Sequence, residues 1–461
     1  MGPLGVCFFV LFLLLSASFS EGGTIGVNYG RVADNLPSPE SVVQLLKTNN
    51  ITHVKMYDAN SEVLKALAGS GIKVTIMMPN QLLQTAAKST VFAAWWVQYN
   101  VAAYYPSTNI QAIAVGNEVF ADPNLTSYLV QAMINVQAAL VKANLDKAIK
   151  VSSPIALSAL QSSYPPSAGA FRQDLAQSVM MPMLQFLRKT GSYLMVNAYP
   201  FFAYEANSND ISLDYALFKT NAGVLDSGSG LTYYSLLDAQ IDAVAYAMSA
   251  LNYDDVQISI SETGWPSEGD ANEIGANVVN AAVYVGNLIE RVVSGTCGTP
   301  KRPKCDMDVY LFALFNEDQK PGPTSERNYG MFYPNEQKVY DVDFVQGNSN
   351  SKSNNTNNGN SNGNNNSTGN VETWCIADPS AGKGKLQTAL DFACGGGEAD
   401  CTAIQPGAAC YEPDTVEAHA SYAFNSYYQK NGREQWTCDF GGAAYVVSQA
   451  PKIGKCTLPS N

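Results

Sequence analysis

Two glutamates at the ends of apolar runs are the side chains in this sequence best suited to chemistry. Glu118 ends the run Ile110–Glu118, and Glu262 ends the run Val256–Glu262. Two carboxyl groups across one site suit cleavage of a glycosidic bond, because one acid protonates the leaving oxygen while the other carboxylate attacks the anomeric carbon or activates water. In a retaining enzyme the two carboxyls would lie about 5–5.5 Å apart. A lone glutamate at a strand end could equally be a loop charge, so the hypothesis depends on the pair.

Aromatic and polar side chains fall at the ends of neighbouring runs. Flat rings can pack on the C–H faces of sugars, and the ring candidates are Tyr29, Tyr57, Tyr199, Trp265 and Phe315. Rings also fill barrel interiors, so we expect about half of these five to serve packing alone. We expect Asn117 and Asn197 to hydrogen-bond sugar hydroxyls. Glu317 and Lys320 could support the glutamate pair electrostatically.

Other catalytic chemistries find little support. The chain has two histidines, and His53 begins a β-type run, which places it at the barrel end away from the site and weighs against a Ser-His-Asp hydrolase. The G-x-S-x-G match at Gly359–Gly363 lies in a low-complexity stretch, and no H-E-x-x-H motif or P-loop occurs. We expect His419 to be a helix residue with a satisfied hydrogen bond. We expect neither a metal nor a cofactor.

At these residues the chain resembles the plant β-1,3-glucanases of glycoside hydrolase family 17. The segment Ile258–Ser267 resembles the nucleophile motif of that family, and Val115–Glu118 resembles its acid/base motif. Three further segments are similar to the family: Gly26–Gly30, Asn197–Pro200 and Asn316–Lys320. The resemblance runs from Thr24 to about Phe344.

This resemblance implies roles for the two glutamates. Glu262 would be the nucleophile and Glu118 the general acid/base of a retaining endo-hydrolase that cuts (1→3)-β-D-glucosidic linkages without a metal. One departure is the turn Tyr57–Asn60, where many relatives have an Arg-containing strand and this chain has Lys55. A catalytically silent glucan-binding wall protein and a hydrolase of mixed-linkage 1,3;1,4-glucan stay open as alternatives.

The elements that must position these residues follow a repeating pattern. Eight β-type runs are rich in Val, Ile, Tyr and Phe and mostly lack polar alternation, as parallel strands covered on both faces do. They are Thr24–Gly30, His53–Asp58, Lys73–Pro79, Ile110–Glu118, Ile149–Ala156, Tyr193–Pro200, Val256–Glu262 and Asp308–Glu317. Helical spacing of apolar residues falls between them, at Pro39–Lys47, Glu62–Ala68, Val91–Tyr105, Tyr128–Leu145, Met181–Lys189, Leu237–Leu251 and Ile274–Val293.

Alternation of this kind predicts an α/β fold, a (β/α)₈ TIM barrel with its active site at the carboxyl ends of the strands. Strands 4 and 7 of such a barrel stand opposite each other, so Glu118 and Glu262 can face one another. The alternative, an open doubly wound sheet, would usually carry a Gly-rich phosphate loop after its first strand, which Gly26–Gly30 does not match.

Composition divides the chain and indicates its compartment. Residues 1–20 read as a signal peptide, with an apolar run followed by small residues. Residues 21–345 would form the hydrolase barrel. Residues 346–370 are almost entirely Asn, Ser, Gly and Thr and read as a disordered linker. Residues 371–461 would form a small disulfide-rich, mainly α module.

Export predicts an oxidising environment and cysteine pairing. Eight cysteines follow the signal segment. In that compartment the N-x-[ST] sites are possible glycan acceptors, and they are Asn50, Asn124, Asn354, Asn365 and Asn366. The formal net charge of −13 argues against nucleic acid as a partner.

The segment from Trp374 to Cys456 resembles the X8 module, carbohydrate-binding family 43 of plants. Its shared features include Trp374-Cys375 and the stretch His419–Asn425. Six cysteines alone allow 15 pairings. The resemblance implies Cys375–Cys438, Cys394–Cys401 and Cys410–Cys456, which leaves Cys297 and Cys305 as a pair in the barrel. The implied ligand is β-1,3-glucan, although a purely structural appendage is the other interpretation.

We therefore expect an extracellular monomer that the plant cell wall retains through glucan. The sequence stops at Asn461 without a hydrophobic tail, so we expect no membrane anchor.

Overall fold

The computed structural model describes residues 23–344 and, within 373–459, all residues except 379–380, 396–398, 434, 439, 441–442, 448–450, 452 and 455. The chain splits into two compact units, Met1–Asn348 and Ser349–Asn461. The predicted signal peptide and linker lie outside the described residues.

The first unit is a parallel barrel, as predicted. Its strands are β1 Ile25–Tyr29, β2 His53–Met56, β3 Lys73–Met78, β4 Asn109–Val115, β5 Lys150–Ser152, β6 Pro154–Ala156, β9 Leu194–Asn197, β12 Ile258–Thr263 and β13 Val309–Leu311. They pair in parallel in the order β5-β4-β3-β2-β1-β13-β12-β9-β6. The predicted fifth strand, Ile149–Ala156, is two short strands, of which β5 pairs with β4 and β6 pairs with β9. This divided strand joins the two edges of the sheet.

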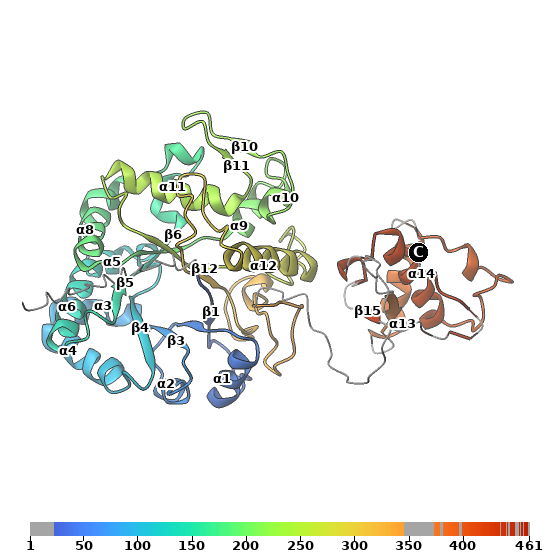
Figure 1. The fold of residues 1–461 in the computed structure, drawn as a ribbon, viewed down its shortest axis with the longest axis horizontal. Helices are drawn as coiled ribbons and strands as arrows, with labels where there is room; N and C mark the ends of the chain where they lie inside the picture. Colours follow the sequence, from blue (N-terminus) through green and yellow to red (C-terminus); the bar gives the residue numbers. More distant parts are fainter. Residues whose placement is uncertain are drawn as a thin grey trace, which may run out of the picture. The chain divides into compact units, whose positions relative to one another are not determined.

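Nearly every strand residue of the barrel is buried, which explains the lack of polar alternation. Helices surround the strands (Figure 1). They are α1 Pro39–Thr48, α2 Ser61–Ala66, α3 Leu83–Lys88, α4 Thr90–Val97, α5 Pro123–Thr126, α6 Leu129–Lys142, α7 Gln173–Leu175, α8 Met181–Thr190, α11 Leu236–Ala250 and α12 Val278–Val293. Ser38 caps α1, with Pro39 in its first turn, as predicted. Helix α12 begins four residues later than predicted because Asn277 caps it at Val278.

Short elements inserted on one side of the barrel were not predicted. They are the antiparallel pair β7 Leu160–Ser162 and β8 Ala170–Phe171, the helices α9 Pro200–Ala206 and α10 Leu213–Ala216, and the antiparallel pair β10 Val224–Leu225 and β11 Thr232–Tyr233. Asp226, which is almost fully buried, accepts hydrogen bonds from the backbone N–H and hydroxyl of Ser167, at 2.8 and 2.7 Å. This carboxylate ties the two hairpin regions together.

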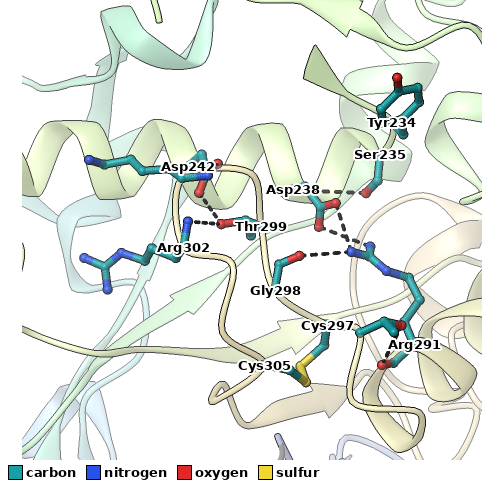
Figure 2. Close-up of polar contacts among 12 residues, drawn as sticks. Tyr234, Ser235, Asp238, Asp242, Arg291, Cys297, Gly298, Thr299, Arg302 and Cys305 are labelled. Atoms are coloured by element: carbon teal, nitrogen blue, oxygen red, sulfur yellow. Dashed lines mark hydrogen bonds and ion pairs between the residues drawn. A yellow bond between two sulfur atoms is a disulfide. The ribbon is translucent and has the colours of Figure 1, made fainter. Parts of the chain in front are cut away.

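A second polar cluster fastens the loop that holds the barrel disulfide, Cys297–Cys305, against α11 and α12 (Figure 2). Asp238 on α11 accepts two hydrogen bonds from the Arg291 guanidinium on α12, at 3.1 and 3.0 Å. One turn further along α11, Asp242 accepts from the Thr299 hydroxyl at 2.5 Å and from the Lys301 backbone N–H at 2.8 Å. Buried carboxylates are thus paired with partners from the loop and the next helix.

The second unit is built on two helices and a short antiparallel ribbon. Its elements are β14 Trp374–Ala377, α13 Lys383–Cys394, α14 Val416–Lys430 and β15 Ala444–Val447. Its disulfides are Cys375–Cys438, Cys394–Cys401 and Cys410–Cys456, the pairs that the resemblance implied. His419 lies in α14, and its Nε2 bonds to the Tyr411 carbonyl at 2.7 Å.

None of the helices in the described part of the chain combines the length and the apolar character needed to cross a bilayer.

Candidate active site

A sharp turn at the end of β4 sets the direction of Glu118. Gly116 has φ +71°, and a Cβ there would meet the Val119 side chain at 2.6 Å, so glycine is required. Glu118 is itself left-handed, with φ 47° and ψ 42°. The Asn80 side chain holds the turn, because it accepts from the Asn117 backbone N–H at 2.8 Å and donates to the Asn117 carbonyl at 2.9 Å.

Glu118 is half-buried and hydrogen-bonded to β9 across the barrel mouth. The Asn197 amide donates to Glu118 Oε1 at 2.8 Å, and Asn197 Oδ1 accepts from the Ser261 hydroxyl on β12 at 2.7 Å. Burial raises the pKa of Glu118, the negative charge of Glu262 raises it further, and the bond from Asn197 opposes both effects. A carboxyl held in this way is suited to carry a proton.

Glu262 sits in a different environment. Its side chain is 7 % exposed. The Lys55 ammonium, from β2, lies 2.8 Å from Glu262 Oε1, and the Tyr199 hydroxyl donates to Oε2 at 2.9 Å. Lys55 is fully buried, and its Nζ lies 4.1 Å from the centroid of the Tyr57 ring. A cation and a hydroxyl on separate oxygens fix the orientation of the Glu262 carboxyl group.

Glu317 and Lys320 follow the last strand. Glu317 is buried and accepts from the Val32 backbone N–H at 2.8 Å, and burial raises its pKa. A Cβ on Gly30 would come within 2.2 Å of the Glu317 carboxylate, so this close approach requires glycine. Lys320 forms an ion pair with Glu326 at 3.0 Å. Both Glu317 and Lys320 line the cleft that holds Glu118 and Glu262.

That cleft has a volume of about 1520 Å³. It brings together eight of the predicted site residues: Tyr57, Asn117, Glu118, Asn197, Tyr199, Glu262, Glu317 and Lys320. It then continues along the inserted elements, where Tyr164, Tyr215 and Leu225 are among its walls. A long cleft that extends well beyond two carboxyls suits a chain-like ligand.

Three predicted ring contacts need correction. Trp265 is fully buried, and its indole N–H donates to the Gly275 carbonyl at 2.8 Å. Phe315 and Tyr29 are 1 % and 3 % exposed and pack edge to face, with ring centroids 6.1 Å apart. None of the three is among the residues that line the cleft, and all three pack in the barrel core. The expectation that about half of the five rings serve packing fits this outcome.

Lys55 was not predicted as a site residue, and the sequence marked it only as a departure from related proteins. Its position inside a strand expected to be buried could have indicated a site residue, because a buried cation requires a partner of opposite charge. Phe312 and Tyr329 also line the cleft, and their T-shaped pair, with centroids 5.5 Å apart, was not predicted. Phe312 lies inside the predicted run Asp308–Glu317, but the observed strand β13 ends at Leu311, and Tyr329 lies beyond both.

Solved structures share the barrel. A β-1,3-glucanase and allergen of Cryptomeria japonica pollen, CJP38, matches with a TM-score of 0.67 and 44 % identity, covering 70 % of this chain and 100 % of that one. A plant β-glucan endohydrolase, one of two described as having distinct substrate specificities, matches with a TM-score of 0.64 and 39 % identity, covering 69 % and 100 %.

Curated relatives match across both units. Glucan endo-1,3-beta-glucosidase 13 of Arabidopsis thaliana is 45 % identical over 450 residues, which is 97 % of this chain and 87 % of that protein. Glucan endo-1,3-beta-D-glucosidase of Olea europaea is 41 % identical over 456 residues, 98 % and 97 %. The model of glycosyl hydrolases family 17 matches residues 25–344, and the X8 domain model matches residues 373–445. This chain is therefore a member of glycosyl hydrolases family 17 that carries an X8 domain after its barrel.

Proposed function

We propose that this protein is a retaining endo-hydrolase of (1→3)-β-D-glucosidic linkages in β-1,3-glucan. The observation that carries the proposal is the unequal environment of two glutamates in one cleft: Glu118 is held with a raised pKa, and Glu262 is held by a buried ammonium and a phenol. The relatives at 41–45 % identity are named for this reaction, which supports the substrate class.

In the first step, protonated Glu118 donates its proton to the glycosidic oxygen while a Glu262 oxygen attacks the anomeric carbon. The bond to the leaving sugar breaks, and a covalent glycosyl–enzyme forms. In the second step, Glu118, now ionised, takes a proton from water, and that water displaces Glu262 from the anomeric carbon. Lys55 and Tyr199 keep the Glu262 oxygens oriented in both steps.

Other residues of the cleft take supporting roles in this proposal. Asn117 and Asn197 offer amides to sugar hydroxyls, and the rings of Tyr57 and Tyr199 offer apolar contact. Glu317 and Lys320 shape the electrostatic field near the pair. The inserted elements provide the walls along which further sugar units would lie.

For the second unit we propose β-1,3-glucan binding. A groove of about 520 Å³ between α13 and α14 is lined by the rings of Phe392, Tyr427 and Phe440. Phe440 stacks on the buried Phe424, with ring centroids 4.0 Å apart, and this contact holds the Phe440 ring in place. Phe392 is 53 % exposed, which leaves a ring surface available to a sugar.

We also propose that the protein is secreted, works as a monomer in the cell wall and carries N-glycans. Asn50 and Asn124 are exposed on the barrel and open to modification. Asn354, Asn365 and Asn366 lie outside the described residues. Four disulfides are consistent with an oxidising compartment.

The test is Glu262→Gln in the full chain. We expect release of reducing ends from soluble β-1,3-glucan to fall by at least about 10⁴-fold, because the variant lacks the nucleophile, while binding to insoluble β-1,3-glucan persists. Glu268→Gln, an exposed carboxylate six residues further on, is the matched control and should leave the rate unchanged.

Two outcomes would contradict the proposal. A Glu262→Gln protein with the wild-type rate would remove the nucleophile from the mechanism. A wild-type protein that binds the polymer but releases no reducing sugar would favour a silent wall-binding protein. Parallel digestion of mixed-linkage 1,3;1,4-glucan, with the anomeric configuration of the first product followed by NMR, decides linkage preference and retention.

A further inference from the structure

A row of aromatic rings stands on the outer surface of the barrel. Helix α4 and the π-helical turn that follows it, Gln98–Ala102, carry Phe92, Trp95 and Tyr99 on one side. The centroids of Phe92 and Trp95 lie 5.8 Å apart, and those of Trp95 and Tyr99 lie 5.2 Å apart. The planes of successive rings differ by 30° and 40°. We call these three residues the aromatic ridge.

The aromatic ridge is open to solvent. Trp95 is 51 % exposed and Tyr99 is 59 % exposed, and Val91 beside them is 78 % exposed. Neighbouring positions on the helix behave differently, because Trp96 is 3 % exposed and Val97 is 1 % exposed. Single exposed rings are ordinary, but a continuous row of large rings on one face marks an interaction surface.

The sequence that forms the aromatic ridge and the helix packed beside it is poor in charge. Between Lys88 and Glu118 the sequence contains no acidic or basic side chain, and between Asp122 and Lys142, which includes nearly all of the packed neighbour α6, it contains none either. Exposed Gln98 adds a neutral amide next to Tyr99. A surface poor in charge suits a neutral polymer of sugars, which would lose no charge solvation on reaching it.

The ridge is distinct from the catalytic cleft. None of its rings is among the residues that line that cleft, and helix α4 contributes nothing to the cleft walls. The three rings belong to the helical layer between β3 and β4, whereas the cleft is built on the carboxyl ends of the strands and the inserted elements. A ligand on the ridge would therefore not occupy the reaction centre.

We propose that the aromatic ridge is a second β-1,3-glucan binding site on the catalytic unit, where a polymer chain rests its C–H faces on Trp95 and Tyr99. The choice of ligand rests on the proposed function. Neighbouring rings tilted by 30° and 40° form a curved row for consecutive sugars, and the indole N–H, phenol and amide provide polar contacts for their hydroxyls. A site of this kind keeps an insoluble polymer near the enzyme.

A second copy of the chain is the competing occupant. A stable protein interface covers about 800 Å² on each partner and some 20–30 residues, whereas the aromatic ridge is a single row of side chains. Its width therefore fits one polysaccharide strand better than a folded surface.

The experiment uses the full chain in the non-cleaving Glu262→Gln background, with Trp95→Ala/Tyr99→Ala compared against Tyr333→Ala, a ring of similar exposure elsewhere on the barrel. We expect several-fold weaker retention on insoluble β-1,3-glucan for the ridge variant alone, and recovery in Trp95→Phe/Tyr99→Phe. Melting temperatures within a degree or two of the parent show that the fold is kept. With Glu262 restored, hydrolysis of a short soluble β-1,3-oligosaccharide should be unchanged.

Unchanged retention of the ridge variant on β-1,3-glucan would overturn the proposal. A shift from dimer to monomer in sedimentation, with retention unchanged, would assign the ridge to self-association. If the ridge variant lost binding to cellulose and to β-1,3-glucan equally, the assignment of β-1,3-glucan as the ligand of the ridge would be overturned. If wild-type protein fails to cleave the soluble oligosaccharide while the ridge variant loses retention, the proposed function fails and the second site stands.

Discussion

At the residue scale, the ion pair between Lys55 and Glu262 separates the roles of the two glutamates. Both partners are buried, and the ammonium lies 2.8 Å from one carboxylate oxygen. Glu118 has no such cation at hydrogen-bond distance among the described contacts and is held by the neutral Asn197 amide instead. In the proposed mechanism this difference in partners suits Glu262 to act as the nucleophile and Glu118 to carry the proton.

Replacing Lys55 by methionine tests this ion pair. The substitution keeps the length of the side chain but leaves Glu262 buried without its cation, which costs about 3–5 kcal/mol of unfolding free energy. Lost orientation should reduce kcat about 100-fold with little change in KM, because Lys55 touches the carboxylate and not the substrate. Steady-state kinetics with soluble β-1,3-glucan and a urea titration measure both effects. Lys55→Arg keeps the charge and should keep most of the activity; a fully active Lys55→Met would remove Lys55 from the mechanism.

The hydrogen bond from Asn197 to Glu118 should affect how activity depends on pH. Burial and then the charge of Glu262 raise the pKa of Glu118, and the Asn197 bond lowers it. The acid must be protonated, so activity falls as the pH rises through this pKa. Removing the donor in Asn197→Ala raises the pKa, and the alkaline limb of kcat/KM should move to higher pH while the maximum falls. Asn197→Asp, which adds a negative charge, should move that limb further in the same direction. A limb that stays in place would contradict the assignment of Glu118 as the acid.

The sequence was sufficient to predict that Glu118 and Glu262 lie in one cleft, because each ends a long apolar run with a recognisable motif. The sequence was insufficient to predict which aromatic rings line the cleft. Trp265 and Phe315 occupy strand ends just as Tyr199 does, yet only Tyr199 lines the cleft. Which side of a strand end faces the barrel mouth depends on register shifts, such as the irregularity in the β12–β9 pairing before Glu262, and these cannot be inferred from residue types.

At the element scale, helices α11 and α12 are joined through the cluster of Figure 2. Burial raises the pKa of Asp238 from 3.8 to about 6, against the lowering effect of Arg291. Because the folded state binds the proton more tightly than the unfolded state, the stability from this group is fully present below pH 3.8 and is lost as the pH rises through about 6.

Urea unfolding of the barrel as a function of pH checks this linkage. Relative to Asp238→Asn, which does not titrate, the wild type should lose unfolding free energy between about pH 4 and pH 6 and then run parallel to it. Glu62→Gln, a change to an exposed carboxylate on α2, serves as the reference for general charge effects. Wild-type and Asp238→Asn curves that stay parallel from pH 4 to pH 7 would contradict the raised pKa.

The barrel order could be predicted because eight apolar runs alternate with helical spacing. The division of the fifth strand at Ser153 was not predicted, although Ser153 and Pro154 interrupt the run Ile149–Ala156 and proline is unusual inside a strand. The inserted hairpins could not be predicted either, because strands of two or three residues carry no periodicity. Their positions depend on single tertiary contacts, such as the bonds from Ser167 to Asp226.

At the scale of the whole molecule, two units with different means of stabilisation share one chain. The barrel has an extensive apolar core and one disulfide across eight positions. The second unit has a small core and three disulfides, of which Cys375–Cys438 spans 63 positions. Small units need such covalent links because they bury a low fraction of their surface.

Removing Cys375–Cys438 by a double serine substitution should therefore act on one unit alone. Loop-closure entropy predicts a loss of about 4 kcal/mol in the second unit. Retention on insoluble glucan should fall, while hydrolysis of a short soluble substrate stays at the wild-type rate. The disulfide Cys297–Cys305 closes a shorter loop, so its removal should cost the barrel about 2.5 kcal/mol of unfolding free energy. This change should lower the unfolding midpoint of the barrel instead. Equal effects of both changes on soluble hydrolysis would contradict independent units.

The left-handed backbone at Glu118 lowers the stability of the fold at a residue that the proposed reaction needs. A side chain with a Cβ costs about 1–2 kcal/mol in that conformation, and glycine would remove the cost. Selection for thermal stability alone would thus favour glycine at position 118, whereas selection for turnover would retain Glu118 as the proposed proton donor. The fold tolerates left-handed dihedral angles at a residue whose carboxyl points into the groove, and a more robust variant of this enzyme has to gain its extra stability elsewhere.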